Sequence, residues 1–314
     1  MQGSQNTAEI ILALDIGGTF IKSAVFQNGA MLRKLPQIPS CSAGSRAEIA
    51  AAIESAIRQA GMVDRIAVAI PGPFDYASGK FLMTHKFAAV KDAYFSEFSC
   101  GKPVSFIHDA NAFLLGEVLH GAARGFLRAG GITLGTGLGA ALSNAGGLAL
   151  DQSGSPAAEV KLWNRPYRNG IAEDYVSIHA LLKDFSGMTA KELEELAAAG
   201  DLRAQEAWCR YSQDLYTLLR EWSERIAPEV IVLGGQLRKG LKLGVPVPAD
   251  LNLRFSELGE DAALWGAYEV AQSSDTLPEP TDTQIRRAIL STGDAEAYQR
   301  FFERAERGDN LMEH

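Results

Sequence analysis

The stretch ALDIGGTFIKSAVF, residues 13–26, joins two apolar, β-branched runs through a glycine pair and places polar groups at the joint. Asp15 ends the first run, and Gly17, Gly18 and Thr19 form the turn. Glycines let a phosphate approach backbone amides, which carry partial positive charge, and the Thr19 hydroxyl can donate a further hydrogen bond. Asp15 could hold Mg²⁺, directly or through water, because hard oxygen ligands suit that ion. The alternative is a structural hairpin in which Asp15 caps its own turn.

A second glycine turn, LGTGLG, occupies residues 134–139, with Thr136 and Gly137 at its tip. Its spacing also fits a GxGxxA dinucleotide fingerprint, but that motif must open a helix. Here the next turn, at 144–147, comes too soon for a helix, and no Walker A loop occurs in the chain. Two hairpin tips that face each other across a cleft could bind nucleotide phosphates, and this interpretation fits the sequence better than either fingerprint does.

The third candidate is Asp109 in FIHDANAF, where a buried strand is expected to stop and a helix to begin. A helix start provides positive potential, which keeps a carboxylate ionised and able to accept a proton from a hydroxyl. In the structural alternative, Asp109 or Asn111 only caps the helix.

Alternating strands and helices must position these residues, which predicts α/β domains with a cleft between them. The two glycine hairpins, one near the start of each half, indicate a weak internal repeat. The expected elements are antiparallel strands over 10–38, a helix over 46–60 ending at Gly61, strands in DRIAVAIPGP and PEVIVLGGQ, a strand and helix in KPVSFIHDANAFLLGEVLHGAARG, two helices over 188–227 broken near Gly200, and a helix in EDAALWGAYEVAQ.

The composition restricts the class of protein. The chain has 314 residues, 46% of them hydrophobic, and a net charge of −8, which argues against binding to nucleic acid. It lacks both a signal peptide and an apolar run long enough for a membrane span. Its cysteines, Cys41, Cys100 and Cys209, are scattered and form no CxxC pair. These features predict a cytoplasmic protein without membrane partners.

As an ordered set, LDIGGT, IPGPFD, HDANAFLLGE, LGTGLG, AAEV, GIAEDYVS, VIVLGG and LGEDAALWGA resemble the motifs of the ROK family of sugar kinases. The resemblance implies a two-lobed actin-like ATPase (ribonuclease H-like) fold with an interdomain cleft. It implies a small N-terminal lobe over 1–122, joined by the 260–271 helix, and a larger lobe over 123–259. Residues 272–314 are expected to form a polar linker and a helical extension.

The resemblance also implies roles for individual residues. The metal-organising carboxylate would be Asp15, acting on Mg²⁺ through water, and the catalytic base would be Asp109. ATP would be bound by two phosphate loops and an adenosine-side turn, and the sugar by acidic and strand-end residues. The ATP-binding set is Asp15, Gly17, Gly18, Thr19, Thr136, Gly137, Gly234 and Gly235, and the sugar-binding set is Gly72, His108, Asp109, Glu159 and Glu173.

The sequence departs from the family pattern at its zinc motif. The stretch EVKLWNRPYRNGIAE contains no Cys or His, and Leu162 stands where the family has its His. We therefore expect no zinc site, and we expect Trp163, Pro166 and Tyr167 to stiffen this loop by packing. His108 replaces a sugar-contacting Asn, and His85 or Lys86 replaces another, so the identity of the sugar is left open.

The resemblance implies phosphoryl transfer from Mg·ATP to a hydroxyl of a hexose or N-acetylhexosamine, at O6, by a homodimer. Two alternatives remain at this stage: a sugar-binding regulator without a DNA-binding domain, and a catalytically weakened sugar-binding protein. Family repressors carry an N-terminal helix-turn-helix, for which a hairpin beginning near residue 10 leaves no room. A dehydrogenase is the least favoured interpretation.

Overall fold

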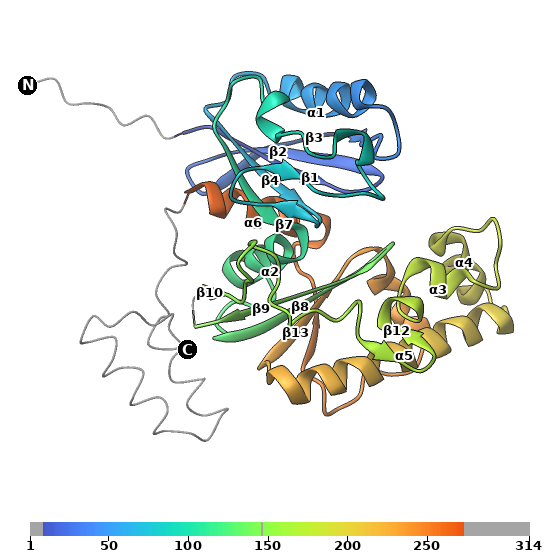
Figure 1. The fold of residues 1–314 in the computed structure, drawn as a ribbon. Coiled ribbons are helices and arrows are strands. Elements are labelled where there is room, and N and C mark those ends of the chain that lie inside the picture. Colours follow the sequence, from blue (N-terminus) through green and yellow to red (C-terminus); the bar gives the residue numbers. More distant parts are fainter. Residues whose placement is uncertain (1–8, 146, 273–314) are drawn as a thin grey trace, which may run out of the picture.

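The computed structural model describes residues 9–145 and 147–272, which form two α/β lobes stacked on each other (Figure 1). Each lobe contains a five-stranded sheet, and the two sheets have the same strand order. In each sheet three strands form an antiparallel meander and two further strands add in parallel. The shared topology confirms the two-lobed fold and explains the internal repeat.

The strands of both sheets can be given in spatial order. The first sheet consists of β3 (Ala30–Pro39), β2 (Phe20–Gln27), β1 (Ile11–Ile16), β4 (Arg65–Ile70) and β7 (Val104–His108). The second consists of β10 (Gly147–Leu148), β9 (Leu138–Asn144), β8 (Arg128–Leu134), β13 (Val230–Gly234) and β14 (Leu253–Phe255). Short strand pairs are β5 (Phe74–Asp75) with β6 (Lys80–Phe81), and β11 (Pro166–Tyr167) with β12 (Gly170–Ile171).

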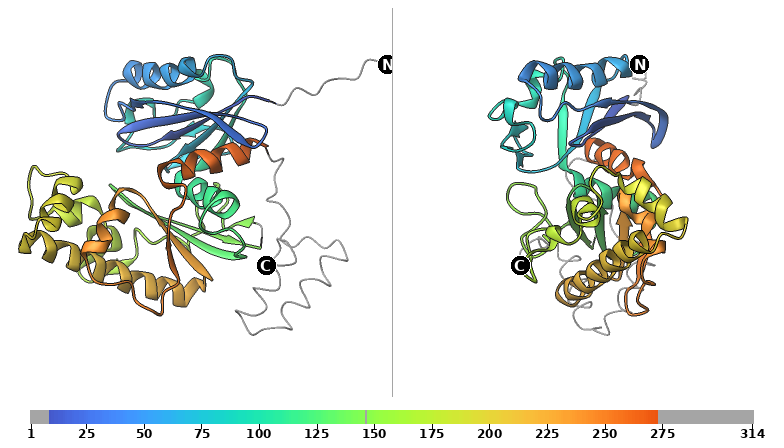
Figure 2. Two further views of the ribbon diagram at one scale, coloured as in Figure 1. Left: turned by 180° about the vertical axis from the view of Figure 1, so that it is seen from behind. Right: turned by 90° about the vertical axis from the view of Figure 1, so that its right-hand side faces the viewer.

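Helices cover both faces of both sheets (Figures 1 and 2). The outer face of the first sheet packs on α1, and the outer face of the second packs on α5. Two helices, α2 and α6, lie between the sheets, with α6 on the first sheet and α2 on the second. The α-helices are α1 (Arg46–Ala60), α2 (Asp109–His120), α3 (Ile178–Leu182), α4 (Ala190–Ala198), α5 (Leu202–Ile226) and α6 (Ala262–Gln272). The short 3₁₀ helices are η1 (Ala88–Val90), η2 (Phe95–Glu97), η3 (Ala172–Asp174), η4 (Gln236–Leu243) and η5 (Gly259–Asp261).

The two middle helices cross in backbone contact because each has a glycine at the crossing point. A Cβ on Gly116 of α2 would collide with the carbonyl of Ala262, and one on Gly266 of α6 would collide with the carbonyl of Ala112. A larger side chain at either glycine would force the helices apart. The small residues of EDAALWGAYEVAQ therefore serve the contact between the lobes.

A buried carboxylate joins the two chain crossings between the lobes. Glu117 of α2 is fully buried, and its carboxylate accepts hydrogen bonds from the Ala122 amide (2.8 Å) and the Leu258 amide (3.1 Å). It also accepts from the Ser256 hydroxyl and the Glu257 amide. Residue 122 lies on the connection from α2 to β8, and residues 256–258 lie on the connection from β14 to α6. One side chain therefore fixes both connections.

Most of the expected elements are present. The helix over 46–60 begins at Ser45, which forms a capping box with Glu48, and ends at Gly61. The turn at Asn28-Gly29 has φ angles of 53° and 74°, the left-handed conformation that a tight hairpin requires. Helices α4 and α5 flank Gly200.

The division of the chain into lobes stays a prediction, because α2 precedes residue 122 and yet packs on the second sheet. The C-terminal extension lies outside the described residues. Within 9–145 and 147–272, none of the helices has the length and apolar character needed to cross a bilayer.

Candidate active site

The first glycine hairpin joins β1 to β2 and carries Asp15 on the strand just before the turn. The Asp15 side chain is 18% exposed, and Oδ2 lies 3.7 Å from Nζ of Lys22. Burial raises the pKa of Asp15 to about 6; the Asp109 carboxylate also raises it, while the Lys22 ammonium opposes the shift. The influence of Asp109 shows that the two predicted functional carboxylates lie within electrostatic range of each other.

The tip of this hairpin presents free backbone donors. The amide of Gly17 donates to the Phe20 carbonyl (3.0 Å) and closes the turn. Within the described parts of the chain, the amides of Gly18 and Thr19 have no hydrogen-bond partner, and Thr19 is exposed. Two adjacent amides without a partner form a small concave site suited to an anion.

Asp109 begins α2 directly after β7, without an intervening turn. Its Oδ1 accepts from the Ala110 amide (2.7 Å), and Nδ1 of His108 accepts from the same amide (3.2 Å). The Asp109 side chain remains 42% exposed, and its Oδ2 has no hydrogen-bond partner among the described residues. The N-cap of α2 is His108, and Asp109, the first residue of the helix, shares the Ala110 amide through one oxygen and can offer the other to a ligand. Asn111, the other capping candidate, is instead fully buried.

His108 and Gly72 lie together at the ends of β7 and β4. A Cβ on Gly72 would lie 3.8 Å from Cδ2 of His108 and 3.6 Å from the hydroxyl of Tyr76. Burial lowers the pKa of His108, although the Asp109 carboxylate opposes this shift. At neutral pH the imidazole is therefore uncharged, and because Nδ1 accepts from the Ala110 amide, the proton is on Nε2, which can donate one hydrogen bond to a ligand.

A segment of the second lobe also reaches this place, which the sequence analysis missed. Nδ2 of Asn111 donates to the Gly154 carbonyl (3.4 Å), and Asp151 forms an ion pair with Lys161 (3.1 Å). The carboxylates of Asp109 and Asp151 add to burial in raising the pKa of Tyr76. The only signal for this segment was DQSGSP, where Asp151 and the following serines form a turn.

The second glycine hairpin joins β8 to β9, with Thr136 exposed at its tip. The Leu138 amide donates to Oε2 of Glu173 (2.8 Å). A Cβ on Gly137 would lie 2.7 Å from the same oxygen, so only glycine leaves room for this carboxylate. The structure thus brings together Gly137 and Glu173, which the sequence analysis assigned to ATP and to the sugar respectively.

Gly234 and Gly235 bring the end of β13 against the second hairpin. Gly235 has a φ of 84°, and a Cβ there would collide with the carbonyl of Leu134. A Cβ on Gly234 would collide with Phe113 of α2. The close approach places the start of η4, which follows Gly235, beside the second hairpin.

The loop that replaces the family zinc motif is held in a different way from that expected. Leu162 is 2% exposed and belongs to the core of the second lobe, whereas Trp163 is 44% exposed, so the expected packing of Trp163 is wrong. Tyr167 does pack, edge-on against Tyr175 at 5.2 Å. Across 9–145 and 147–272, no group of three or more His, Cys, Asp and Glu side chains is arranged to hold a metal ion. Glu159 is exposed, and its carboxylate contacts no other described residue.

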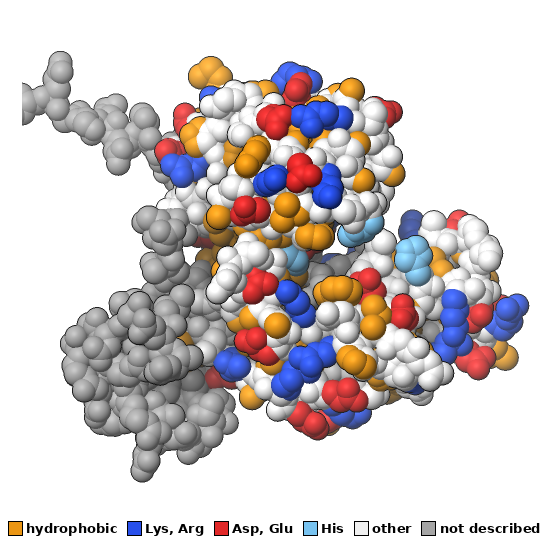
Figure 3. All heavy atoms as spheres, viewed as in Figure 1, with side chains coloured by type: hydrophobic (Ala, Val, Ile, Leu, Met, Phe, Trp, Pro, Cys, Tyr) orange, Lys and Arg blue, Asp and Glu red, His pale blue; other side chains and the backbone are white. Residues whose placement is uncertain are grey.

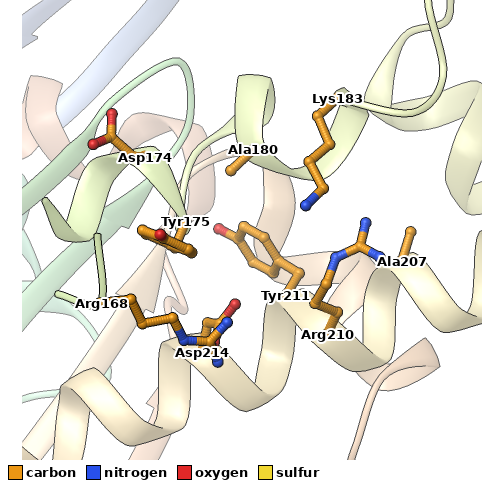
Figure 4. Close-up of a pocket in the computed structure, with 9 residues that line it drawn as sticks. All are labelled: Arg168, Asp174, Tyr175, Ala180, Lys183, Ala207, Arg210, Tyr211 and Asp214. Atoms are coloured by element: carbon orange, nitrogen blue, oxygen red, sulfur yellow. The ribbon is translucent and has the colours of Figure 1, made fainter. Parts of the chain in front are cut away.

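A polar cavity of about 70 Å³ lies between this loop and α5, and neither Asp15 nor Asp109 is among the residues that line it (Figure 4). Two of its cations are already neutralised, since Arg168 is paired with Asp214 and Arg210 with Asp184. Asp214 also accepts from the Tyr167 hydroxyl (2.9 Å). This network anchors the loop on α5 and so supports the segment that carries Glu173.

The predicted site residues therefore form two groups, one in each lobe. Asp15, Gly72, His108 and Asp109 lie at the carboxyl ends of β1, β4 and β7 or directly after them. The second hairpin, Glu173 and the turn at 234–235 form the other group. The surface is hollowed between the two lobes (Figure 3). Ligands of open α/β sheets bind at this end of the strands.

Comparisons with known proteins agree with this architecture. A model of the ROK family matches residues 11–158. The bifunctional enzyme NanE/NanK of Brucella melitensis is 29% identical over 284 residues, which cover 83% of this chain and 54% of that enzyme. The N-acetylgalactosamine kinase AgaK of a Shewanella species is 28% identical over 249 residues, covering 71% of this chain and 80% of that kinase.

Solved structures share the fold. The structure of a ROK family glucokinase from Streptomyces griseus, in complex with glucose and AMPPNP, matches with a TM-score of 0.70 and 22% identity, covering 84% of this chain and 100% of that chain. This chain spans about half the length of the bifunctional relatives it matches. The family match begins with strand β1. It continues through the second glycine hairpin and includes the segment whose Gly154 carbonyl accepts from Asn111. The N-terminal part of the chain, residues 11–158, is thus similar to the ROK family.

Proposed function

We propose that this protein is an ATP-dependent kinase that phosphorylates a hydroxyl group, O6, of a hexose or an N-acetylhexosamine. The observation that carries the proposal is the pairing of two carboxylates at one end of a sheet. The Asp109 carboxylate contributes to the raised pKa of Asp15, after burial, and Asp15 directly precedes a hairpin tip whose amides are free. Phosphoryl transfer needs a phosphate cradle, a metal-organising oxygen and a base for the acceptor, and these groups supply all three.

The phosphates of ATP would be bound by hairpin tips from both lobes. The free amides of Gly18 and Thr19 supply donors from the first lobe, and Thr136 and Gly137 supply them from the second. Gly234 and Gly235 would border the adenosine. The net charge of −8 makes such local donors necessary, because the chain as a whole repels a polyphosphate.

The residues at the first tip also fit Mg²⁺. Asp15 offers hard carboxylate oxygens, and its raised pKa reflects a buried charge that lacks full compensation. When bound, Mg²⁺ would neutralise charge on the phosphates. Asp15 would hold the ion through water, and Lys22 would keep the carboxylate in place.

Asp109 would remove the proton from the sugar hydroxyl. The bond from the Ala110 amide fixes Oδ1, so Oδ2 is oriented and free for the acceptor. Asp109 begins α2, and a general base must lie within hydrogen-bond reach of the proton it removes. His108, Gly72, Glu159 and Glu173 would contact the other hydroxyls of the sugar, without a zinc site.

The acceptor class is supported by the names of the relatives, one of which is an N-acetylgalactosamine kinase. A coupled assay of ADP release against hexoses, N-acetylhexosamines and their epimers tests the proposal. We expect one sugar to stimulate ADP release and the Asp109→Asn variant to abolish it while ATP still binds. No stimulation by any sugar, or unchanged turnover in the variant, would contradict the proposal. Size measurements in solution would test the expected homodimer.

A further inference from the structure

Lys86 lies against the tip of the first glycine hairpin. A Cβ built on Gly18 would lie 3.3 Å from Cε of Lys86 and 3.6 Å from its Nζ. The Lys86 side chain is half-buried, whereas Thr84 and His85, which precede it, are exposed. The ammonium group therefore lies beside Gly18, in the turn whose amides at Gly18 and Thr19 are free.

Neighbouring residues fix this placement. Phe87 is fully buried and has a left-handed backbone with a φ of 54°. Its amide donates to the carbonyl of Ser42 (2.7 Å), and the hydroxyl of Ser42 donates to the carbonyl of Gly18 (2.5 Å). Met83, on the other side of Lys86, is also fully buried. A non-glycine residue adopts this backbone conformation only where its surroundings hold it, so the segment is anchored next to the hairpin.

The charge of Lys86 has no partner. Across residues 9–145 and 147–272 its ammonium forms no ion pair, whereas Lys22, the other cation at this hairpin, is paired with Asp15. A half-buried ammonium group carries three hydrogen-bond donors that need acceptors. Placed beside two free amides, it completes a site for a dianionic or trianionic group.

We propose that Lys86 is a catalytic residue that binds the terminal phosphate of ATP and stabilises charge on it during transfer. This inference rests on the proposed function. The terminal phosphate is chosen because the hairpin tip and Asp109 lie at the same end of the first sheet, so the phosphate nearest the acceptor is the one at this tip. A single cation aimed at developing charge accelerates such reactions by about 10²- to 10³-fold.

The test compares Lys86→Met and Lys86→Arg with Lys91→Met, a control that removes an exposed lysine from the same segment. Calorimetric titration with ATP, ADP and AMP gives the affinities, and ADP release with the accepted sugar gives kcat. For Lys86→Met we expect affinity for ATP to fall about tenfold or more, because a hydrogen bond to a charged group is lost. Affinity for AMP should be unchanged and kcat should fall about 100-fold. Lys86→Arg should recover part of both losses, and Lys91→Met should match the wild type.

Two results would overturn the inference while leaving the proposed function intact. One is an active wild type with a Lys86→Met variant that behaves like Lys91→Met. The other is a variant in which only the KM for the sugar rises, which would assign Lys86 to the sugar. A wild type that binds no ATP and phosphorylates no sugar would instead reject the proposed function, and the inference with it.

Discussion

The two glycine hairpins have the same backbone topology and carry different chemistry. At the first, β1 itself supplies Asp15, and the tip is bordered by Lys22 and Lys86. At the second, the carboxylate at the tip is that of Glu173, 35 residues beyond the amide it binds. A repeated hairpin thus provides backbone amides in both lobes. The strands of the first hairpin themselves carry the charged side chains Asp15 and Lys22, whereas Glu173 reaches the second hairpin from a distant segment. We infer that the first hairpin binds the phosphate that is transferred and that the second contacts both ATP and the sugar.

The largest effect should follow from removing the carboxylate that distinguishes the first hairpin. Asp15→Asn keeps the size of the side chain but loses the charge that would organise the metal. We expect kcat to fall about 10³-fold, by analogy with the loss of other preorganised electrostatic groups. Rate measurements over a range of Mg²⁺ concentrations check this, with Thr136→Ser as the matched mild change at the other tip. Nearly normal turnover would remove the proposed difference between the hairpins.

The same substitution should stabilise the metal-free protein. The pKa of Asp15 is about 6 in the folded chain against 3.8 ordinarily, so the wild type loses stability as pH rises through this interval. Above pH 6 the cost is up to about 3 kcal/mol, and below about pH 3.8 it vanishes. Thermal unfolding in chelator should therefore show a higher Tm for Asp15→Asn at pH 8 and the two melting curves converging near pH 4. A lower Tm at pH 8 would contradict the burial of this charge.

A smaller effect is expected from filling the second tip. In Gly137→Ala the new methyl group would press on Oε2 of Glu173, whereas in Gly135→Ala it would meet nothing within 4 Å. We expect Gly137→Ala to raise the KM for both ATP and the sugar, about tenfold each, since a displaced hydrogen bond to a charged group costs about 1.5 kcal/mol. Steady-state kinetics of both variants check this. Equal behaviour of the two alanines would show that Glu173 does not link the two sites.

The last expected effect is on stability and concerns the connections between the lobes that carry the two hairpins. Glu117→Gln keeps one acceptor oxygen but places an NH₂ group against backbone N–H donors. We therefore expect the free energy of unfolding to fall by about 1–3 kcal/mol. Urea unfolding measures this, with Glu257→Gln, an exchange in the same region, as the control. An unchanged midpoint would mean that the buried carboxylate does not hold the connections.

The two hairpins also show which features of the structure could be predicted from the sequence. The glycine tips, the strand that carries Asp15 and the helix from 46 to 60 follow from local alternation and turn chemistry, so they could be predicted, although the strand ends one residue later, at Ile16. The placement of Lys86 against Gly18 could not, because it depends on a chain of contacts through Ser42 and Phe87. The same holds for α2, whose attachment to the second sheet depends on Gly131 of β8, where a Cβ would press on Leu114 of α2. Such contacts join segments far apart in the chain, and no local pattern encodes them.

The most direct test is a crystal structure of the protein with Mg²⁺ and a non-hydrolysable ATP analogue. We predict that the phosphate chain lies between the lobes and accepts hydrogen bonds from the amides of Gly18 or Thr19 on one side and from Thr136 or Gly137 on the other. A phosphate chain bound by one hairpin alone, or bound away from Asp15, would contradict the account.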